Sequence, residues 1–164
     1  MEKNQTIINR IFTADSISQK LAYWQFKGKK IVFTNGCFDV LHLGHVEYLS
    51  KAAELGDILI IGLNSDASVK RLKGANRPIN PEHARAFILA SLRFVDAVIF
   101  FDEDTPYNLI KLIQPDILVK GNDYKPEDIV GYDIVSAKGG EVKTVELVEG
   151  FSSSLIIEKM KSEK

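Results

Sequence analysis

Short apolar segments alternate with amphipathic ones along the chain, and this alternation predicts strands that are followed by helices. Ile31–Phe33 and Ile58–Leu63 carry no polar residue, which is typical of strands buried on both faces. Between them, apolar residues recur at helical spacing over residues 43–55, and Gly56 follows as a stop signal. The same reasoning predicts strands at 97–101, 117–119 and 141–147, and helices at 80–94, 105–114, 126–137 and 153–160.

One more helix is expected before the first strand. Ser16 and Gln19 form a capping-box pattern, and apolar residues follow at helical spacing up to Gly28. Alternating strands and helices, with strands of continuous apolar character, predict an α/β fold with a doubly wound parallel five-stranded sheet and helices on both faces. Ligands of such sheets bind at the carboxyl ends of the strands, so chemistry is expected in the loops that follow them.

Composition sets limits on this picture. The 164 residues, 45% apolar and 26% charged, predict one domain over 1–164, with an N-terminal helix within 1–28 and a catalytic core over 29–160. The net charge of −1 argues against a nucleic acid partner, because the chain has no general basic field. The apolar runs are too short to span a bilayer, so no membrane association is expected. The single cysteine, Cys37, favours the reducing cytoplasm.

The stretch from Thr34 to His45 falls in the first strand-to-helix loop and holds two of the three histidines. His42 and His45 are three residues apart at a helix start, so both imidazoles are expected on one face, beside free backbone N–H groups. Gly44 between them leaves room for a phosphate to approach. Three interpretations stay open: two surface histidines at a helix cap, a metal-ligating pair that lacks a third ligand nearby, and two donors that stabilise a phosphoryl group.

Other polar segments also have two interpretations each. Ser152–Ser154 precede the last expected helix, where one serine suffices as an N-cap and the surplus hydroxyls suit the phosphates of a nucleotide. Lys120 directly follows the fourth expected strand. Its ammonium either points toward the rim of the site or belongs to an ordinary surface lysine. Asp39 is expected to orient the histidine loop rather than to ligate magnesium, and Cys37 to fill space. Four basic residues after the second strand form either a solvated face or a mobile loop that closes on phosphates: Lys70, Arg71, Lys73 and Arg77.

The motifs Gly36–Asp39 and His42–His45 resemble the signature of the cytidylyltransferase-like nucleotidyltransferases, a Rossmann-like superfamily that transfers a nucleoside monophosphate from an NTP to a phosphate acceptor. Further segments match it in order: Asn64–Asp66, Arg85, Arg93–Asp96 and Gly150–Ile157. Three segments are similar to the adenylyltransferase half of the bifunctional heptose kinase/adenylyltransferases: Glu103–Pro106, Leu118–Glu127 and Gly139–Val142. Two features depart from the pattern, because Ser153 and Ser154 stand where threonines are usual and Asn122 where a second glycine is common.

The resemblance implies transfer of AMP from ATP to D-glycero-D-manno-heptose 1-phosphate, a step toward lipopolysaccharide and other surface glycans, with Mg²⁺ as cofactor and no metal ligands in the protein. It also implies a homo-oligomer, expected as a dimer, and a separate protein that makes the sugar phosphate. The implied roles are catalytic for His42, His45 and Lys73; nucleotide-binding for Asn35, Gly36, Cys37, Phe38, Gly44, Ser152, Ser153 and Ser154; and substrate-binding for Asp39, Asn64, Asp66, Arg77, Arg85, Lys120 and Asp123. Two alternatives stay open: a glycerol-3-phosphate cytidylyltransferase-like enzyme and a non-catalytic nucleotide-sensing module.

Overall fold

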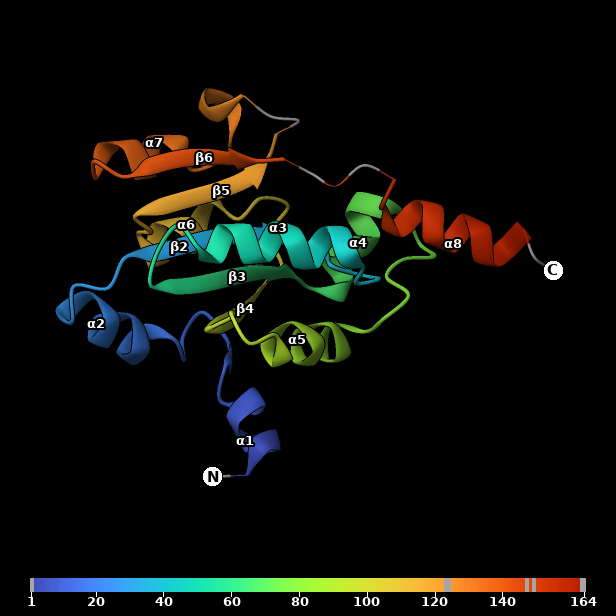
Figure 1. The fold of residues 1–164 in the computed structure, drawn as a ribbon, viewed down its shortest axis with the longest axis horizontal. Coiled ribbons are helices and arrows are strands. Elements are labelled where there is room, and N and C mark those ends of the chain that lie inside the picture. Colours follow the sequence, from blue (N-terminus) through green and yellow to red (C-terminus); the bar gives the residue numbers. More distant parts are fainter. Residues whose placement is uncertain (1, 123–124, 147, 149, 163–164) are drawn as a thin grey trace.

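The computed structural model describes residues 2–122, 125–146, 148 and 150–162, and it places a parallel sheet between two layers of helices (Figure 1). The strand order is β1-β4-β3-β2-β5-β6. The strands are β1 (Ile11–Phe12), β2 (Ile31–Gly36), β3 (Ile58–Asn64), β4 (Ala97–Phe101), β5 (Ile117–Gly121) and β6 (Glu141–Val145). The helices are α1 (Lys3–Ile8), α2 (Ser18–Phe26), α3 (Leu43–Ala53), α4 (Asp66–Lys73), α5 (Glu82–Ser91), α6 (Tyr107–Ile113), α7 (Tyr132–Ala137) and α8 (Ser153–Ser162), with a 3-10 turn η1 at Pro126–Asp128.

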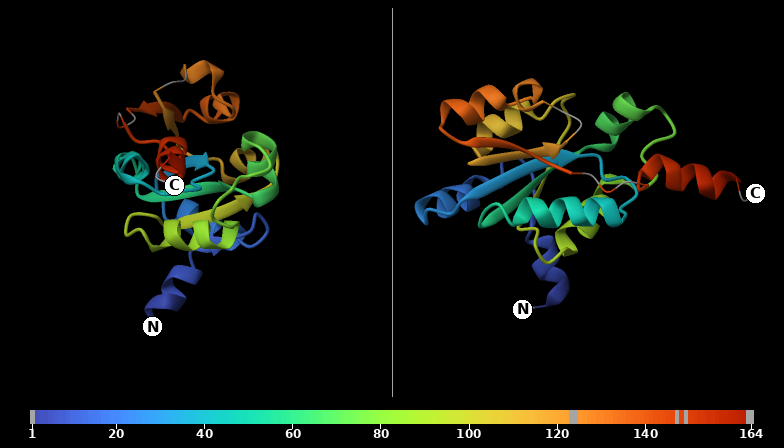
Figure 2. Two further views of the ribbon diagram at one scale, coloured as in Figure 1. Left: turned by 90° about the vertical axis from the view of Figure 1, so that its right-hand side faces the viewer. Right: turned by 45° about the horizontal axis from the view of Figure 1, so that its top comes forward.

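Two hydrophobic clusters, one on each face of the sheet, hold the layers together. Helices α2, α6 and α7 cover one face, where Trp24 and Ile110 pack with Phe33 and Ile60 of the central strands. Helices α3 and α5 cover the other face, where Leu49 packs with alternate residues of the same strands. The two layers are visible in the rotated views of Figure 2. Because both faces of β2 and β3 are covered, their sequences contain no polar alternation, and the expected doubly wound parallel sheet is confirmed.

The sheet has six strands, so the prediction of five was wrong by one edge strand. The additional strand, Ile11–Phe12, has two residues and pairs with Val98 and Ile99 of β4. An element of this length carries no periodicity of its own, and its pairing with a strand more than 80 residues later forms it. The expected capping box is also absent, because α2 begins after Ile17 and no side chain caps it. The hydroxyl of Ser16 is instead engaged with Thr13.

Residues 66–73, expected as part of a loop, form the helix α4. Its N-cap is Ser65, whose side-chain oxygen accepts a hydrogen bond from the N–H of Ser68 at 3.0 Å. Charged residues fill half of the helix and Val69 is its one buried large apolar residue, so the sequence has no apolar stripe to reveal it.

The sheet opens at the carboxyl ends of β2 and β5. Strand β2 pairs with β3 along its whole length, up to Gly36, but it pairs with β5 only at Val32 and Phe33. The chain crosses from one side of β2 to the other between β4 and β5, so β2 is the switch point of the doubly wound sheet. Such openings are where ligands bind in this class of fold.

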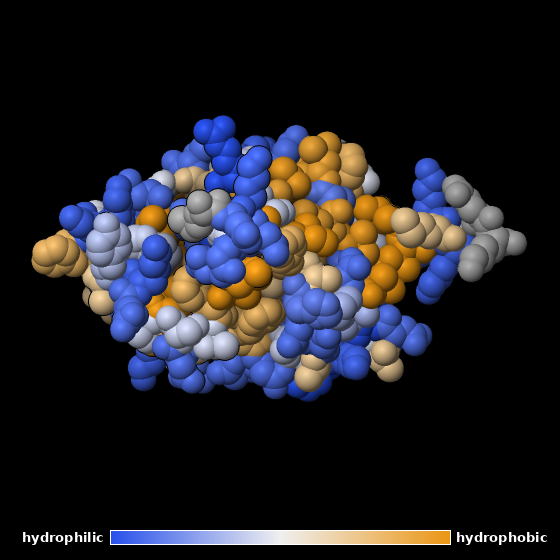
Figure 3. All heavy atoms as spheres, turned by 90° about the horizontal axis from the view of Figure 1, so that it is seen from below, coloured by the Kyte–Doolittle hydropathy of each residue, from blue (hydrophilic) through white to orange (hydrophobic). Residues whose placement is uncertain are grey.

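Helix α8 projects from the body of the molecule (Figures 1 and 2) and buries none of its residues. Its apolar side chains include Leu155 and Met160, both more than half exposed. Seen from the side of α1, apolar side chains also remain exposed between the N-terminal helix and the C-terminal end of the chain (Figure 3). No helix in the described part of the chain is long and apolar enough to cross a membrane.

Candidate functional site

A cavity of about 500 Å³ lies at the opening of the sheet, and it is surrounded by segments at or after the ends of β2, β3, β4 and β5 and by the start of α8. It is lined by these residues with an expected role: Asn35, Gly36, Cys37, Phe38, Asp39, His42, Gly44, His45, Asn64, Lys73, Arg77, Lys120, Ser152, Ser153 and Ser154. Two others, Asp66 and Arg85, do not line it. Asp123 lies outside the described residues. The structure thus brings together most of a set that the sequence distributes over some 120 positions.

The two histidines stand at the start of α3, as their spacing predicts. Their rings stack, with centroids 3.8 Å apart and planes 22° from parallel. The Nδ1 atoms of both rings are buried and have no hydrogen-bond partner among the described residues. No side chain caps α3, whose N-cap position is occupied by His42. Two histidines, each with a ring nitrogen unpaired within the described chain, and the N-terminus of α3 therefore lie at the wall of the cavity, an arrangement suited to an anion.

Both imidazoles are neutral in the ligand-free protein at neutral pH. Burial, together with positive charge at His42 and Lys73, lowers the pKa of His45 to about 4. Burial also lowers the pKa of His42. A phosphate in the cavity places negative charge beside the rings and removes part of the repulsion, so it favours the protonated form that desolvation disfavours.

Gly44 and Phe38 pack closely against the two histidine rings. A Cβ added to Gly44 would stand 3.2 Å from ring atoms of His42 and 3.2 Å from the Cβ of Phe151, so any larger residue must displace one of them. Phe38 has a φ of 44°, in the left-handed region that costs a bulky residue about 1 kcal/mol or more. Its buried ring packs edge-on against His45 at a centroid distance of 5.2 Å. The unfavourable backbone conformation of Phe38 therefore occurs where its ring packs against His45, a candidate catalytic residue.

The carboxylate of Asp39 holds the segment that follows α4 against the histidine loop. It accepts hydrogen bonds from the backbone N–H groups of Ile79 at 2.7 Å and Asn80 at 2.9 Å, and from Nε of Arg77 at 2.6 Å. Burial alone would raise the pKa of Asp39, but these donors outweigh it and lower the pKa below its usual range. This geometry agrees with the orienting role expected for Asp39. Arg77 keeps a buried Nη2 with no partner among the described residues.

Arg85 lies behind the cavity and joins three segments that surround it. Its guanidinium is fully buried and donates to the carbonyl oxygen of Cys37 at 2.6 Å, to that of Asn80 at 3.0 Å and to the carboxylate of Asp66 at 2.8 Å. A buried arginine needs such partners, because an unpaired buried charge is very costly. The geometry therefore favours support of the loop for Arg85 and Asp66 over direct contact with a ligand.

Of the four basic residues expected in a closing loop, three belong to α4. Lys73 is at its last position and lines the cavity. Arg71 does not line the cavity itself and makes ion pairs with Asp102 and with Asp104 of the cavity wall, the latter at 2.9 Å. Arg77 follows the helix and reaches Asp39. The helix, and not a loop, thus presents Lys73 to the cavity.

Ser152, Ser153 and Ser154 differ in their contacts. Ser152 accepts a hydrogen bond from the N–H of Leu155 at 3.1 Å and so caps α8. Ser153 donates to the carbonyl oxygen of Val40 at 3.0 Å, which ties the start of α8 to the histidine loop. Ser154 lines the cavity beside them. Opposite, Lys120 at the end of β5 donates to the side-chain oxygen of Asn35 at the end of β2.

Several residues of the cavity wall were not expected from the sequence: Tyr48, Leu72, Asp104, Gly121, Val148 and Phe151. Two of them had a usable signal. Tyr48 is three residues after His45 on the same helical face, and Phe151 directly precedes the serines. The others reach the cavity only through the tertiary arrangement.

The described residues contain no group of three or more His, Cys, Asp or Glu side chains that could hold a metal ion. The carboxylate nearest the histidine loop, Asp39, is already bonded to three donors. Mg²⁺ accepts one or two protein ligands when phosphate oxygens supply others. The described donors therefore fit an ion whose other ligands are phosphate oxygens of a nucleotide.

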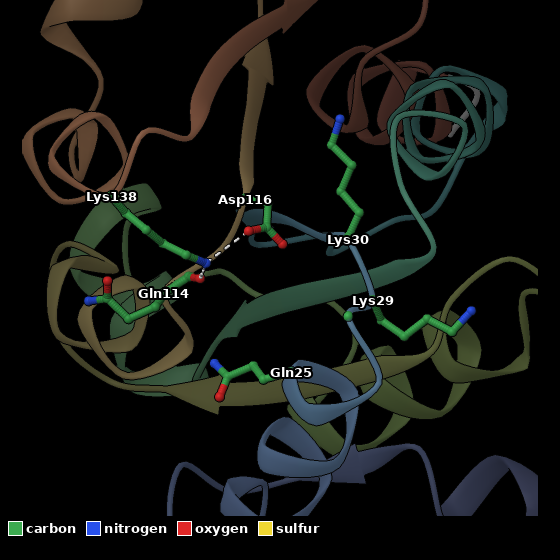
Figure 4. A pocket seen from close by; sticks show the side chains of 7 residues that line it. Gln25, Lys29, Lys30, Gln114, Asp116 and Lys138 are labelled. Atoms are coloured by element: carbon green, nitrogen blue, oxygen red, sulfur yellow. Dashed lines mark hydrogen bonds and ion pairs between the residues drawn. The ribbon is translucent and has the colours of Figure 1, made fainter.

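A second cavity, of about 690 Å³, lies at the opposite edge of the sheet between α2 and α6 (Figure 4). Asp116 lines it and accepts hydrogen bonds from the N–H of Ile31 and from Lys138. In Figure 4 the side chains of Lys29 and Lys30 point away from this pair. Asp116 and Lys138 are paired with each other, whereas His42, His45 and Arg77 of the first cavity keep unpaired nitrogen atoms among the described residues, so the first cavity is the better candidate.

The fold and the cavity at its switch point define a doubly wound, Rossmann-like α/β protein with its polar residues gathered at the strand ends. The chain belongs to the cytidylyltransferase-like family, whose model matches residues 33–159. This membership confirms the resemblance carried by the motifs around Gly36 and His42.

Individual relatives agree with the family. The chain is 63% identical over 136 residues to the bifunctional protein HldE of a Nitratiruptor species, a match that covers 83% of this chain and 29% of the relative. It is 55% identical over 151 residues to the protein of the same name from Wolinella succinogenes, with 92% of this chain and 31% of the relative covered. The chain thus spans less than a third of the length of these relatives.

A solved structure shares the fold. It is described as the lipopolysaccharide core biosynthesis protein from Thermoplasma volcanium. The TM-score is 0.59 at 28% sequence identity, and the match covers 74% of this chain and 98% of that one. In that neighbour, the matched region is almost the entire chain.

Proposed function

We propose that this chain is a nucleotidyltransferase that moves AMP from ATP to D-glycero-D-manno-heptose 1-phosphate. An oxygen of the sugar phosphate attacks the α-phosphorus of ATP, the bond from that phosphorus to the β-bridging oxygen breaks, and pyrophosphate leaves with the electron pair. The products are ADP-heptose and pyrophosphate. Support comes from the family membership, from the HldE relatives, and from the segments around Glu103, Lys120 and Gly140 that resemble the heptose-specific members.

The observation that carries the proposal is the pair of buried imidazole Nδ1 atoms of His42 and His45 without partners among the described residues. In-line phosphoryl transfer leaves little acid–base work for a protein, because its barrier comes from charge on the phosphoryl oxygens and on the leaving group. Donors fixed in advance at that position lower the barrier without reorganising. We assign to His42, His45 and Lys73 the role of stabilising this charge.

The remaining residues divide between the two substrates. We assign the loop Asn35–Phe38, together with Gly44, to the nucleotide, whose β and γ phosphates would meet Ser152–Ser154 and the N-terminus of α8. Lys120, Asp123 and Arg77 are assigned to the sugar phosphate. Asn64 stands at the end of β3 beside the cavity, while Asp66, Arg85 and Asp39 hold the loops that surround it.

Mg²⁺ is proposed as the cofactor and would come with ATP. When bound to the phosphates it supplies additional positive charge to the leaving pyrophosphate. ATP is available in the cytoplasm, and we place the reaction there. We also propose a homodimer, because α8 buries none of its residues and exposes Leu155 and Met160. Sedimentation equilibrium tests this, and a monomer at micromolar concentration would contradict it.

A matrix of nucleotides and acceptors tests the proposed reaction. ATP, CTP, GTP and UTP are each incubated with heptose 1-phosphate, glucose 1-phosphate and glycerol 3-phosphate, and pyrophosphate release is followed. Release is expected with ATP and the heptose. Release with CTP and glycerol 3-phosphate alone would establish the cytidylyltransferase alternative, and nucleotide binding without any release would establish a sensing module.

A further inference from the structure

The opening between β2 and β5 separates two strand ends that carry residues of the cavity wall. The two strands pair at Val32–Ile117 and Phe33–Leu118 only. Beyond this point β2 continues to Gly36 beside β3, and β5 continues to Gly121 beside β6. The strand ends that carry the site are therefore not joined to each other by a backbone ladder.

The side chain of Tyr48 occupies this gap. Tyr48 belongs to α3, and its hydroxyl oxygen lies 2.7 Å from the hydroxyl of Thr34 on β2. The same hydroxyl donates to the carbonyl oxygen of Val119 on β5 at 3.1 Å. Since Tyr48 gives its single proton to Val119, the Thr34 hydroxyl is the donor to Tyr48. One phenol thus bridges the two strands where their ladder has ended.

The next residue on each strand carries a polar side chain of the cavity. Asn35 follows Thr34 and Lys120 follows Val119, and the Lys120 ammonium donates to the Asn35 side chain. The bridge is buried, with Tyr48 8% exposed and Thr34 fully buried, so water does not replace a lost bond at low cost. The positions of Asn35 and Lys120 relative to each other thus depend on the bridge beneath them.

We propose that Tyr48 is a positioning residue that sets the distance between the nucleotide-binding end of β2 and the acceptor-binding end of β5. This inference rests on the proposed function, because it takes Asn35 to face the nucleotide and Lys120 to face the sugar phosphate. Loss of the bridge leaves each substrate its own contacts but relaxes their mutual alignment. Misplacement of reacting groups by about 1 Å reduces rates on the order of 100-fold, so the effect is expected in kcat.

The packing of the Tyr48 ring provides the competing explanation. The ring belongs to the cluster of Leu49, Ala52 and Val119, and a purely structural role would need the ring and not the hydroxyl. Tyr48→Phe removes the hydroxyl and keeps the ring. Thr34→Val removes the other hydroxyl of the bridge at nearly constant volume. The two substitutions and their combination therefore form a double-mutant cycle on the bridge itself.

The test compares kcat and KM for both substrates at a temperature well below the unfolding transition. We expect Tyr48→Phe to lower kcat on the order of ten-fold or more, with each KM changed by less than about three-fold. Thr34→Val should lower kcat in the same way, and the double variant should be no slower than Tyr48→Phe alone. Tyr107→Phe is the matched control, because it removes a hydroxyl that joins α6 to Asp133, away from the cavity. It should retain wild-type kinetics.

A kcat for Tyr48→Phe within two-fold of wild type would overturn the proposal, as would a fully additive double variant. If the wild-type protein releases no pyrophosphate with any substrate pair, the proposed function fails. In that case amide hydrogen exchange tests whether the Tyr48 hydroxyl holds the two strand ends in place. Faster exchange at residues 34–36 and 119–121 in Tyr48→Phe, with Tyr107→Phe unchanged, would support it. Unchanged exchange at both strand ends would refute it.

Discussion

Acid should destabilise this protein through His45 in particular. The pKa of His45 is lowered from 6.5 to about 4 in the folded chain, first by burial and then by the charges of His42 and Lys73. In the unfolded chain the imidazole returns to its ordinary pKa and binds a proton more readily. The unfolded state therefore binds more protons than the folded state between pH 6.5 and 4, and stability must fall as the pH drops through this window.

The magnitude follows from the two pKa values. At pH 7 both states are largely deprotonated at His45, so the histidine contributes little. At pH 5 the unfolded state is protonated and the folded state is not, which by linkage costs the fold about 2 kcal/mol. His45 is only partly buried, and solvent screening reduces the expected loss to about 1–2 kcal/mol.

Urea unfolding of the ligand-free protein at pH 7, 6 and 5 measures this loss. His45→Gln lacks the titrating group, so between pH 7 and 5 it should lose about 1–2 kcal/mol less stability than the wild type. His83→Gln, a change at a histidine on the surface of α5, is the control and should follow the wild-type curve. Parallel curves for the wild type and His45→Gln would show that His45 is not held neutral by its surroundings.

Three further predictions concern the site. His42→Ala removes one fixed donor and should lower kcat on the order of 100-fold, or about 3 kcal/mol, with the unfolding temperature little changed; steady-state kinetics that retain half of the wild-type kcat would contradict the assignment. Ser154→Ala should weaken ATP binding by roughly 1.5–3 kcal/mol in calorimetric titrations. Ser152→Ala removes the cap of α8 and should chiefly lower the free energy of unfolding, by about 1 kcal/mol. The reverse pattern would exchange the roles of the two serines. Gly44→Ala places a methyl group 3.2 Å from the His42 ring and the Phe151 side chain, so it should raise the KM for ATP several-fold, and unaltered kinetics would show that the rings yield freely.

The sequence alone was a good guide wherever an element carries its own local pattern. Strands buried on both faces must be apolar throughout, so Ile58–Leu63 could be assigned without knowledge of its neighbours, and the structure places β3 there. The histidine loop was predictable for a similar reason. A strand at Ile31–Phe33 and a helix from about Leu43 place the stretch between them at a carboxyl end of the sheet, although β2 in the structure continues to Gly36.

Elements without such a pattern were missed. Strand β1 has two residues and exists because Ile11 pairs with Val98. Helix α4 is polar on most of its surface, and it is fixed at its start by the cap at Ser65 and by the carboxylate of Glu82, which accepts from the N–H of Asp66. Ser65 is a local signal, but Val98 and Glu82 lie outside the two segments, so their contribution cannot be seen in the segments by themselves.

For this protein the sequence by itself determined the alternation of strands and helices, the layered parallel sheet and the edge at which polar residues gather. The tertiary structure decided how those residues are used. It turned Arg71 toward Asp102 and Lys73 toward the cavity, engaged Asp39 with Ile79 and Asn80, and placed the Tyr48 hydroxyl between β2 and β5. Local patterns follow from backbone periodicity and the burial of apolar surface, whereas each of these contacts joins distant segments whose meeting depends on the packing of the whole sheet.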